Sequence, residues 1–120
     1  TIMIGLVPRP IHALLDYSWS ALAIFSPQLF NFEEDKTAGA YCKLIGAGTI
    51  AASLMTRYEL GLVRLLPFNL HLKLDLMGAL LGIASPWLLG FHKNEKARGA
   101  VLGLAIFEMF AVLLSKPDRK

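Results

Sequence analysis

The sequence predicts an all-α integral membrane protein, a four-helix bundle that forms a single transmembrane domain over residues 1–120. Two observations carry this prediction. Hydrophobic residues make up 55% of the chain and charged residues only 18%, which is far more apolar than ordinary soluble domains. The apolar residues also gather into blocks whose length suits a bilayer-spanning helix, which needs about 20 residues.

Four apolar blocks are separated by clusters of charged residues. They run from Pro10 to Phe32, from Thr37 to Thr56, from Leu70 to Phe91 and from Ala97 to Ser115. A soluble four-helix bundle would need a polar stripe along each helix, but long parts of the blocks are apolar all round. We therefore interpret each block as a membrane-spanning helix.

The basic residues predict how this bundle is oriented. With four spans, the two termini and the middle connection share one side of the membrane. That side carries Arg9, Arg57, Arg64, Lys73, Lys116, Arg119 and Lys120, and the other carries Lys36, Lys93, Lys96 and Arg98. Because cytoplasmic loops carry the excess of Lys and Arg, both termini are predicted to be cytoplasmic.

The two halves of the chain resemble each other. A shift of 59 residues aligns Pro8, His12, Asp16, Ser26 and Pro27 with Pro67, His71, Asp75, Ser85 and Pro86. Farther along, a shift of 60 aligns Lys36 with Lys96 and Leu44 with Leu104. Each repeat, about 7–56 and about 66–115, contains two spans and so keeps one direction. The sequence therefore predicts parallel two-helix repeats related by a pseudo-two-fold axis along the membrane normal.

The tripeptide Ser85-Pro86-Trp87 lies in an apolar block within this duplicated unit. In this respect the chain resembles the SPW repeat family of small bacterial membrane proteins. The resemblance covers residues from about Val7 to Ser115, although Gln28 stands in the first repeat where the second has Trp87. It implies a four-span fold and a place in the bacterial inner membrane, and it implies no reaction.

Two His/Asp pairs are the candidate ligand or polar pairs. His12 and Asp16 are four residues apart, as are His71 and Asp75, so each pair shares one face of a helix. We expect these pairs to be polar helix starts, with the acid near the positive end of the helix dipole. The alternatives are that both pairs converge on the axis as a His2Asp2 metal site, a bis-histidine haem site or a proton relay.

Glu108 is an acid near the middle of the fourth block. It is interpreted as an interhelical hydrogen bond or an oligomer contact, with a proton or cation site as the alternative.

Two further sets of residues concern the shape of the helices. A proline inside a helix frees a carbonyl one turn back, and an adjacent serine can bond back to that turn. We therefore predict helix kinks at Ser26, Pro27, Ser85, Pro86 and Trp87.

Small residues spaced four apart allow helices to approach closely in lipid, which predicts helix packing at Gly78, Gly82, Gly99 and Gly103.

The sequence carries no catalytic motif, and we predict no catalytic residue. The single cysteine, Cys42, excludes a disulfide framework and multi-cysteine metal sites, and the low charge excludes a nucleic-acid module.

We expect a non-enzymatic scaffold or accessory protein of the lipid bilayer, as a homo-oligomer or part of a larger membrane complex, with no cofactor. The alternatives are a protein that binds a metal or haem through the His/Asp pairs, and a small ion or solute transporter or channel that uses Glu108 and the proline-broken helices.

Overall fold

A computed structural model describes residues 8–56 and 66–115 of the chain. They form four α-helices, and no β-strand occurs within these two ranges. The helices are α1 (Arg9–Leu29), α2 (Lys36–Leu54), α3 (Phe68–Leu88) and α4 (Glu95–Leu114). The predicted all-α, four-helix fold is thereby confirmed, with each helix lying within a few residues of its predicted block.

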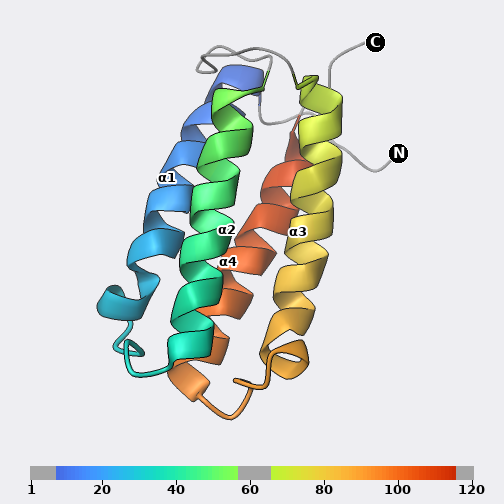
Figure 1. Cartoon of the computed structure of the whole chain (residues 1–120). Coiled ribbons are helices and arrows are strands. Elements are labelled where there is room, and N and C mark those ends of the chain that lie inside the picture. Colours follow the sequence, from blue (N-terminus) through green and yellow to red (C-terminus); the bar gives the residue numbers. More distant parts are fainter. Residues whose placement is uncertain (1–7, 57–65, 116–120) are drawn as a thin grey trace.

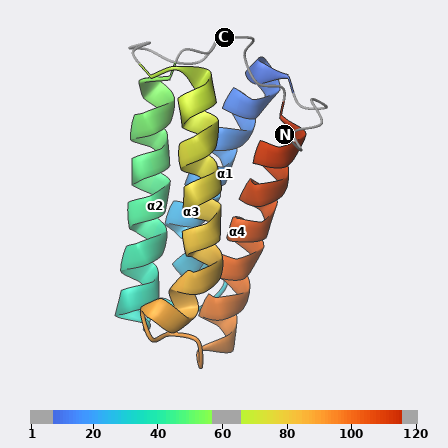
Figure 2. The same ribbon diagram turned by 90° about the vertical axis from the view of Figure 1, so that its right-hand side faces the viewer.

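The helices run alternately up and down as two hairpins. The α1–α2 and α3–α4 turns lie at one end of the bundle, and the beginnings of α1 and α3 lie at the other (Figures 1 and 2). Each hairpin packs closely within itself, whereas contacts between the hairpins are fewer, along α1–α4 and α2–α3. This leaves α1 and α3 diagonally opposite each other across the bundle axis.

The helices α2 and α4 begin with equivalent side-chain caps. The carboxylate of Asp35 accepts a hydrogen bond from the backbone N–H of Ala38 at 3.0 Å, and the side-chain oxygen of Asn94 accepts one from Ala97 at 3.2 Å. Such caps satisfy backbone donors that the first helical turn leaves without partners. The amide of Asn94 also donates to Asp35 at 3.1 Å, which joins the two hairpins at this end.

These caps correct one detail of the predicted repeat. Asp35 and Asn94 are 59 residues apart, and so are Ala38 and Ala97, which are both fully buried. The change of the shift from 59 to 60 in the second helix of each hairpin is therefore wrong. The two hairpin turns have the same length, so the spacing of 59 continues through α2 and α4.

The prolines lie in the last turns of their helices. Pro27 is inside α1, which ends at Leu29, and Pro86 is inside α3, which ends at Leu88. The hydroxyl of Ser85 donates to the carbonyl of Gly82 at 2.8 Å, which is the carbonyl that Pro86 leaves without its N–H partner. The hydroxyl of Ser26 donates to the carbonyl of Leu22 at 2.7 Å, one residue before the carbonyl that Pro27 leaves without its N–H partner. These motifs accompany the ends of the two helices, and neither divides a helix in its middle.

Both helices then enter the hairpin turn through a left-handed residue. Asn31 has a φ of 58° and Gly90 a φ of 82°, a conformation that Gly and Asn adopt most readily after a helix. Trp87 lies on the outside near this turn, where it is 55% exposed and stacks on His92. Its indole therefore covers the outer surface at the end of α3.

The glycines predicted to mediate packing differ in their surroundings. A β-carbon added at Gly82 would lie 2.8 Å from that of Ala105, so α3 and α4 approach closely there. One added at Gly78 would make an ordinary contact, and those at Gly99 and Gly103 would meet no atom within 4 Å in the described parts of the chain. Gly99 and Gly103 instead line an apolar groove of about 590 Å³ beside α1.

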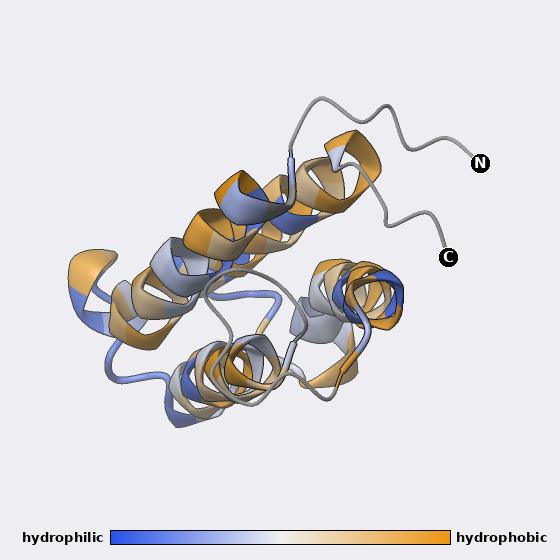
Figure 3. Cartoon of the chain, turned by 90° about the horizontal axis from the view of Figure 1, so that it is seen from above, coloured by the Kyte–Doolittle hydropathy of each residue, from blue (hydrophilic) through white to orange (hydrophobic). Residues whose placement is uncertain are grey.

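Many large apolar side chains are exposed and many polar side chains are buried, which is the reverse of the usual pattern in a soluble bundle. Large apolar residues such as Phe25, Leu44, Leu81 and Phe110 are exposed, and apolar segments run along all of the helices (Figure 3). Polar and ionisable side chains lie inside, namely His12, Asp16, Ser20, Ser26, Ser53, Thr56, His71, Asp75, Ser85, Glu108 and Ser115. By length and mean hydropathy, only α4 among the helices of the described ranges qualifies as a candidate membrane span.

The two glycine environments predict opposite effects of the same substitution. Alanine is favoured over glycine inside a helix by roughly 0.8–1.0 kcal/mol, so Gly103→Ala should raise the thermal stability of the protein in detergent. Gly82→Ala should lower it, because forcing β-carbons together in a packed contact costs about 1–3 kcal/mol. Thermal unfolding followed by circular dichroism measures both, and equal stability of the two variants would contradict the close approach.

Candidate metal centre

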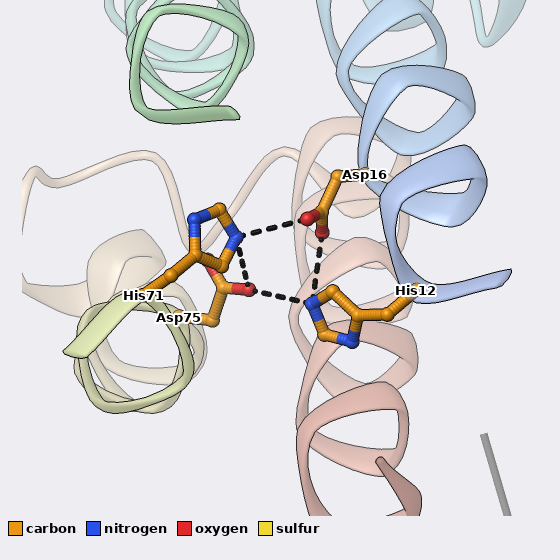
Figure 4. A group of neighbouring side chains, drawn as sticks. All are labelled: His12, Asp16, His71 and Asp75. Atoms are coloured by element: carbon orange, nitrogen blue, oxygen red, sulfur yellow. Dashed lines mark hydrogen bonds and ion pairs between the residues drawn. The ribbon is translucent and has the colours of Figure 1, made fainter. Parts of the chain in front are cut away.

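Two histidines and two aspartates meet between α1 and α3 (Figure 4). The Nε2 atom of His12 lies 3.3 Å from Asp16 and 3.2 Å from Asp75. The Nε2 atom of His71 lies 2.9 Å from Asp16 and 3.0 Å from Asp75. Each imidazole thus faces the aspartate of its own helix and that of the opposite helix. The structure brings together the two pairs that we expected to be separate helix starts.

Two hydroxyl groups hold the outer nitrogens of the histidines. Nδ1 of His12 lies 2.5 Å from the hydroxyl of Ser115, which follows α4, and Nδ1 of His71 lies 2.7 Å from that of Thr56, near the end of α2. Each histidine is therefore positioned by a residue of the opposite hairpin. Like the histidines, the two hydroxyl residues are 59 positions apart.

The hydroxyls also fix which nitrogen of each ring carries a proton. The hydroxyl of Ser115 donates to the carbonyl of Ala111, and that of Thr56 donates to the carbonyl of Ala52. Their own hydrogens are thereby used, so each hydroxyl oxygen accepts from the Nδ1–H of its histidine. The Nε2 atoms then point at the carboxylates, and each must present either a second proton or a lone pair that binds a cation.

The four side chains of the cluster are buried. His12 and His71 are each 1% exposed, and Asp16 and Asp75 are 3% and 7% exposed. The ring of Phe68 packs against both imidazoles, with centroid distances of 5.2 and 6.3 Å. Buried carboxylates are costly unless they are paired, so the two negative charges require two positive charges. Two imidazolium ions or one divalent cation supply them.

The cluster has the dimensions of a metal site. One ligand atom from each of the four residues can be chosen so that all lie within 4.8 Å of one another. Ligand atoms at about 2.0–2.1 Å from a tetrahedral Zn²⁺ are separated by about 3.3 Å. The nitrogen–oxygen distances of 2.9–3.3 Å are close to that value, so small side-chain shifts suffice to admit an ion.

Glu108 lies outside these ion pairs. Its side chain on α4 is buried, with 6% exposure, and it faces a cavity of about 300 Å³ whose wall also includes Asp75. No hydrogen bond or ion pair joins it to another residue of the described ranges. The predicted interhelical hydrogen bond is therefore not formed there.

Thr56 and Ser115 are not among the site residues that the sequence predicts. A signal existed, because both are hydroxyl residues at the repeat spacing of 59 and both stand where a block ends. The shift of 60 pairs Thr56 with Lys116 and so conceals the match. Hydroxyls at helix ends are also common, and only the structure shows that they reach the histidines.

Comparison of the chain with protein-family models, with curated protein sequences and with solved structures gives no match. The resemblance of Ser85-Pro86-Trp87 to SPW repeats therefore remains an expectation. What the cluster does must be inferred from its own chemistry.

The buried charges predict that, in the presence of a chelator, replacing one residue of the cluster destabilises the protein more than replacing all four. His12→Gln leaves two buried carboxylates facing one histidine, and breaking a buried ion pair in this way costs about 3–5 kcal/mol. A fourfold variant with Gln at His12 and His71 and Asn at Asp16 and Asp75 removes every charge and should cost less. Unfolding in detergent compares them, and a fourfold variant less stable than His12→Gln would contradict the ion-pair network.

Proposed function

We propose that the chain is an integral membrane protein that binds one divalent transition-metal ion, with Zn²⁺ as the reference ion, through His12, Asp16, His71 and Asp75. The observation that carries this proposal is the orientation of the imidazoles. Both have Nδ1–H engaged by a hydroxyl and Nε2 directed at the same two carboxylates. Ligating histidines are commonly fixed by such a hydrogen bond on the other nitrogen.

The donor set suits a divalent transition metal. Imidazole nitrogen and carboxylate oxygen together are ligands for Zn²⁺, Fe²⁺ and Mn²⁺, and two aspartates neutralise the charge of the ion. Four protein ligands complete a tetrahedral shell, as in structural zinc sites, whereas catalytic sites keep one position open. This supports ion binding in a non-enzymatic protein.

The same geometry favours an ion over haem. In a bis-histidine haem the porphyrin occupies the space beside both Nε2 atoms. Here Asp16 and Asp75 lie there, within 3.3 Å of those nitrogens. Haem binding would require both carboxylates to leave, whereas a metal ion would use them as ligands.

The distribution of side chains supports the membrane location. A soluble bundle buries its large apolar residues, but here Phe25, Leu44, Leu81, Phe110 and others are exposed. The helices have 19 to 21 residues, a length of about 30 Å, which matches the hydrocarbon core of a bilayer. Several of the polar residues that lower the mean hydropathy of α1 and α3 are buried, among them His12, Asp16, His71 and Asp75, whereas Lys73 is exposed. We therefore propose four spans in parallel repeats, in the inner membrane of a bacterium with both termini cytoplasmic.

The membrane location predicts how the protein fractionates. When membranes of expressing cells are washed with alkaline carbonate, the chain should stay in the pellet and require detergent for release, because its exposed surface is apolar. A peripheral protein expressed in the same cells serves as the control. Release of the chain into the wash would contradict the four spans.

Metal binding predicts the behaviour of specific variants. Purified protein should bind one Zn²⁺ per chain by elemental analysis and calorimetry, and His12→Ala and His71→Ala should each abolish binding. Thr56→Val should weaken affinity about 10- to 100-fold, because the group that orients His71 is lost. Ser53→Ala is the matched control, since the buried hydroxyl of Ser53 has no hydrogen-bond partner in the described ranges.

Two outcomes would reject the metal site. Protein that takes up no divalent metal after removal of a chelator would support the scaffold function, with the cluster as a network of imidazolium and carboxylate ions. Metal binding that survives both histidine substitutions would place the ion elsewhere in the chain.

A further inference from the structure

A cavity inside the bundle adjoins the buried His/Asp cluster. Its volume is about 300 Å³, at the lower end of the range for small-molecule sites, about 300–1,000 Å³. Small residues of α2, α3 and α4 create the space, namely Gly48, Ala52, Gly78, Ala79, Gly82 and Ala105. Asp75 is the residue of the cluster that also borders it.

Glu108 brings to this cavity an acidic side chain without an ion-pair partner among the described residues. Its side chain is 94% buried, since 6% is exposed, and it has no hydrogen-bond or ion-pair partner in the described parts of the chain. The cluster beside it balances its own charges, either as two imidazolium ions with two carboxylates or as one divalent ion with two carboxylates. A carboxyl group that is buried without a counter-ion stays uncharged by holding a proton, and it is stable as a carboxylate only with a cation beside it. The cavity provides space for that counter-ion.

The cavity opens sideways, through the surface of the bundle. Among its lining residues only Gly48, Leu74 and Gly78 are exposed, and all three belong to α2 and α3. Gly48 and Gly78 stand in the middle third of their helices, far from the charged ends. In the proposed membrane location this opening faces lipid acyl chains, so an occupant reaches it most readily if part of it is apolar.

The walls favour an organic cation. Trp19 and Tyr41 both line the cavity, and the indole of Trp19 is fixed by a 2.9 Å hydrogen bond to the carbonyl of Leu104. Ammonium groups are attracted to the faces of aromatic rings as well as to a carboxylate. A hydrated metal ion, in contrast, gains nothing from an opening that faces acyl chains.

We propose that this cavity is a second site, which binds an amphiphilic alkylammonium ion with its head at Glu108 and its tail through the opening between α2 and α3. The proposal rests on the membrane location proposed above and does not depend on metal binding. It gives the chain a ligand of a different chemical class from the ion of the His/Asp cluster.

Trp19 lines this cavity and also the apolar groove beside α1, so its fluorescence reports a ligand in either place, and the variants described below assign the signal to the cavity. The chain has two tryptophans, so Trp87→Phe leaves Trp19 as the only reporter. Purified protein of this background in a neutral detergent is titrated with octylammonium and, separately, with 1-octanol, which has the same tail and no charge. Octylammonium should bind at least about tenfold more tightly, as expected for a hydrogen bond to a charged group. Equal affinities would overturn the proposal.

Three variants locate the site. Glu108→Gln should abolish the preference for octylammonium over octanol, whereas Glu95→Gln, at an exposed acid of the same helix, should keep it. Gly48→Leu should weaken octylammonium binding by blocking the opening, and it should fold normally because a β-carbon there meets no atom within 4 Å. A preference for octylammonium that persists in Glu108→Gln, or an octylammonium affinity that is unchanged in Gly48→Leu, would overturn the proposal.

The failure of this site can be distinguished from the failure of the metal site. The Zn²⁺ content of the same samples is measured with and without chelator. Octylammonium binding in metal-free protein supports the second site even where no metal is taken up. Loss of Zn²⁺ binding in His71→Ala without loss of the octylammonium preference would show that the two sites are separate.

Discussion

The arrangement of the two hairpins depends on the pairing of two histidines with two aspartates across the bundle axis. The hydrogen bond from Asn94 to Asp35 and the apolar cluster around Phe32 and Phe91 also join the hairpins, but each buried charge of the cluster costs several kcal/mol unless it is compensated. Compensation requires all four side chains at once, because Asp75 lies within 3.2 Å of both His12 and His71. The cluster therefore fixes the position of α1 relative to α3 along the bundle axis.

The hydroxyls of Thr56 and Ser115 hold the two imidazoles of this cluster in one orientation. Without them either imidazole could rotate or exchange the roles of its nitrogens. Because each hydroxyl has already given its hydrogen to a helix carbonyl, it accepts only the Nδ1–H, and both Nε2 atoms are left facing the carboxylates. An ion-pair network needs no such control of the tautomer, whereas a metal site does.

The sequence predicted the four helices and the His/Asp pairs because both depend on local spacing. Apolar blocks of about 20 residues define the helices, and a separation of four residues places His12 beside Asp16. The meeting of the two pairs was not predictable, since it depends on the rotation of α1 and α3 about their own axes. The same holds for Gly82 and Gly103, which have equal spacing signals but opposite surroundings. Spacing identifies the face of a helix, and the neighbouring helix decides whether that face is covered.

The spacing of 59 residues relates the His/Asp cluster and the cavity in different ways. Every residue of the cluster has its partner at that spacing, so the two halves contribute equally and the charges cancel. In the cavity, Thr49 corresponds to Glu108 and both line the wall, so one half supplies a neutral hydroxyl and the other an acid. The cavity is therefore asymmetric, although it adjoins a symmetric cluster. Because Asp75 belongs to the cluster and also borders the cavity, a cation bound in the cavity would lie near a carboxylate of the cluster.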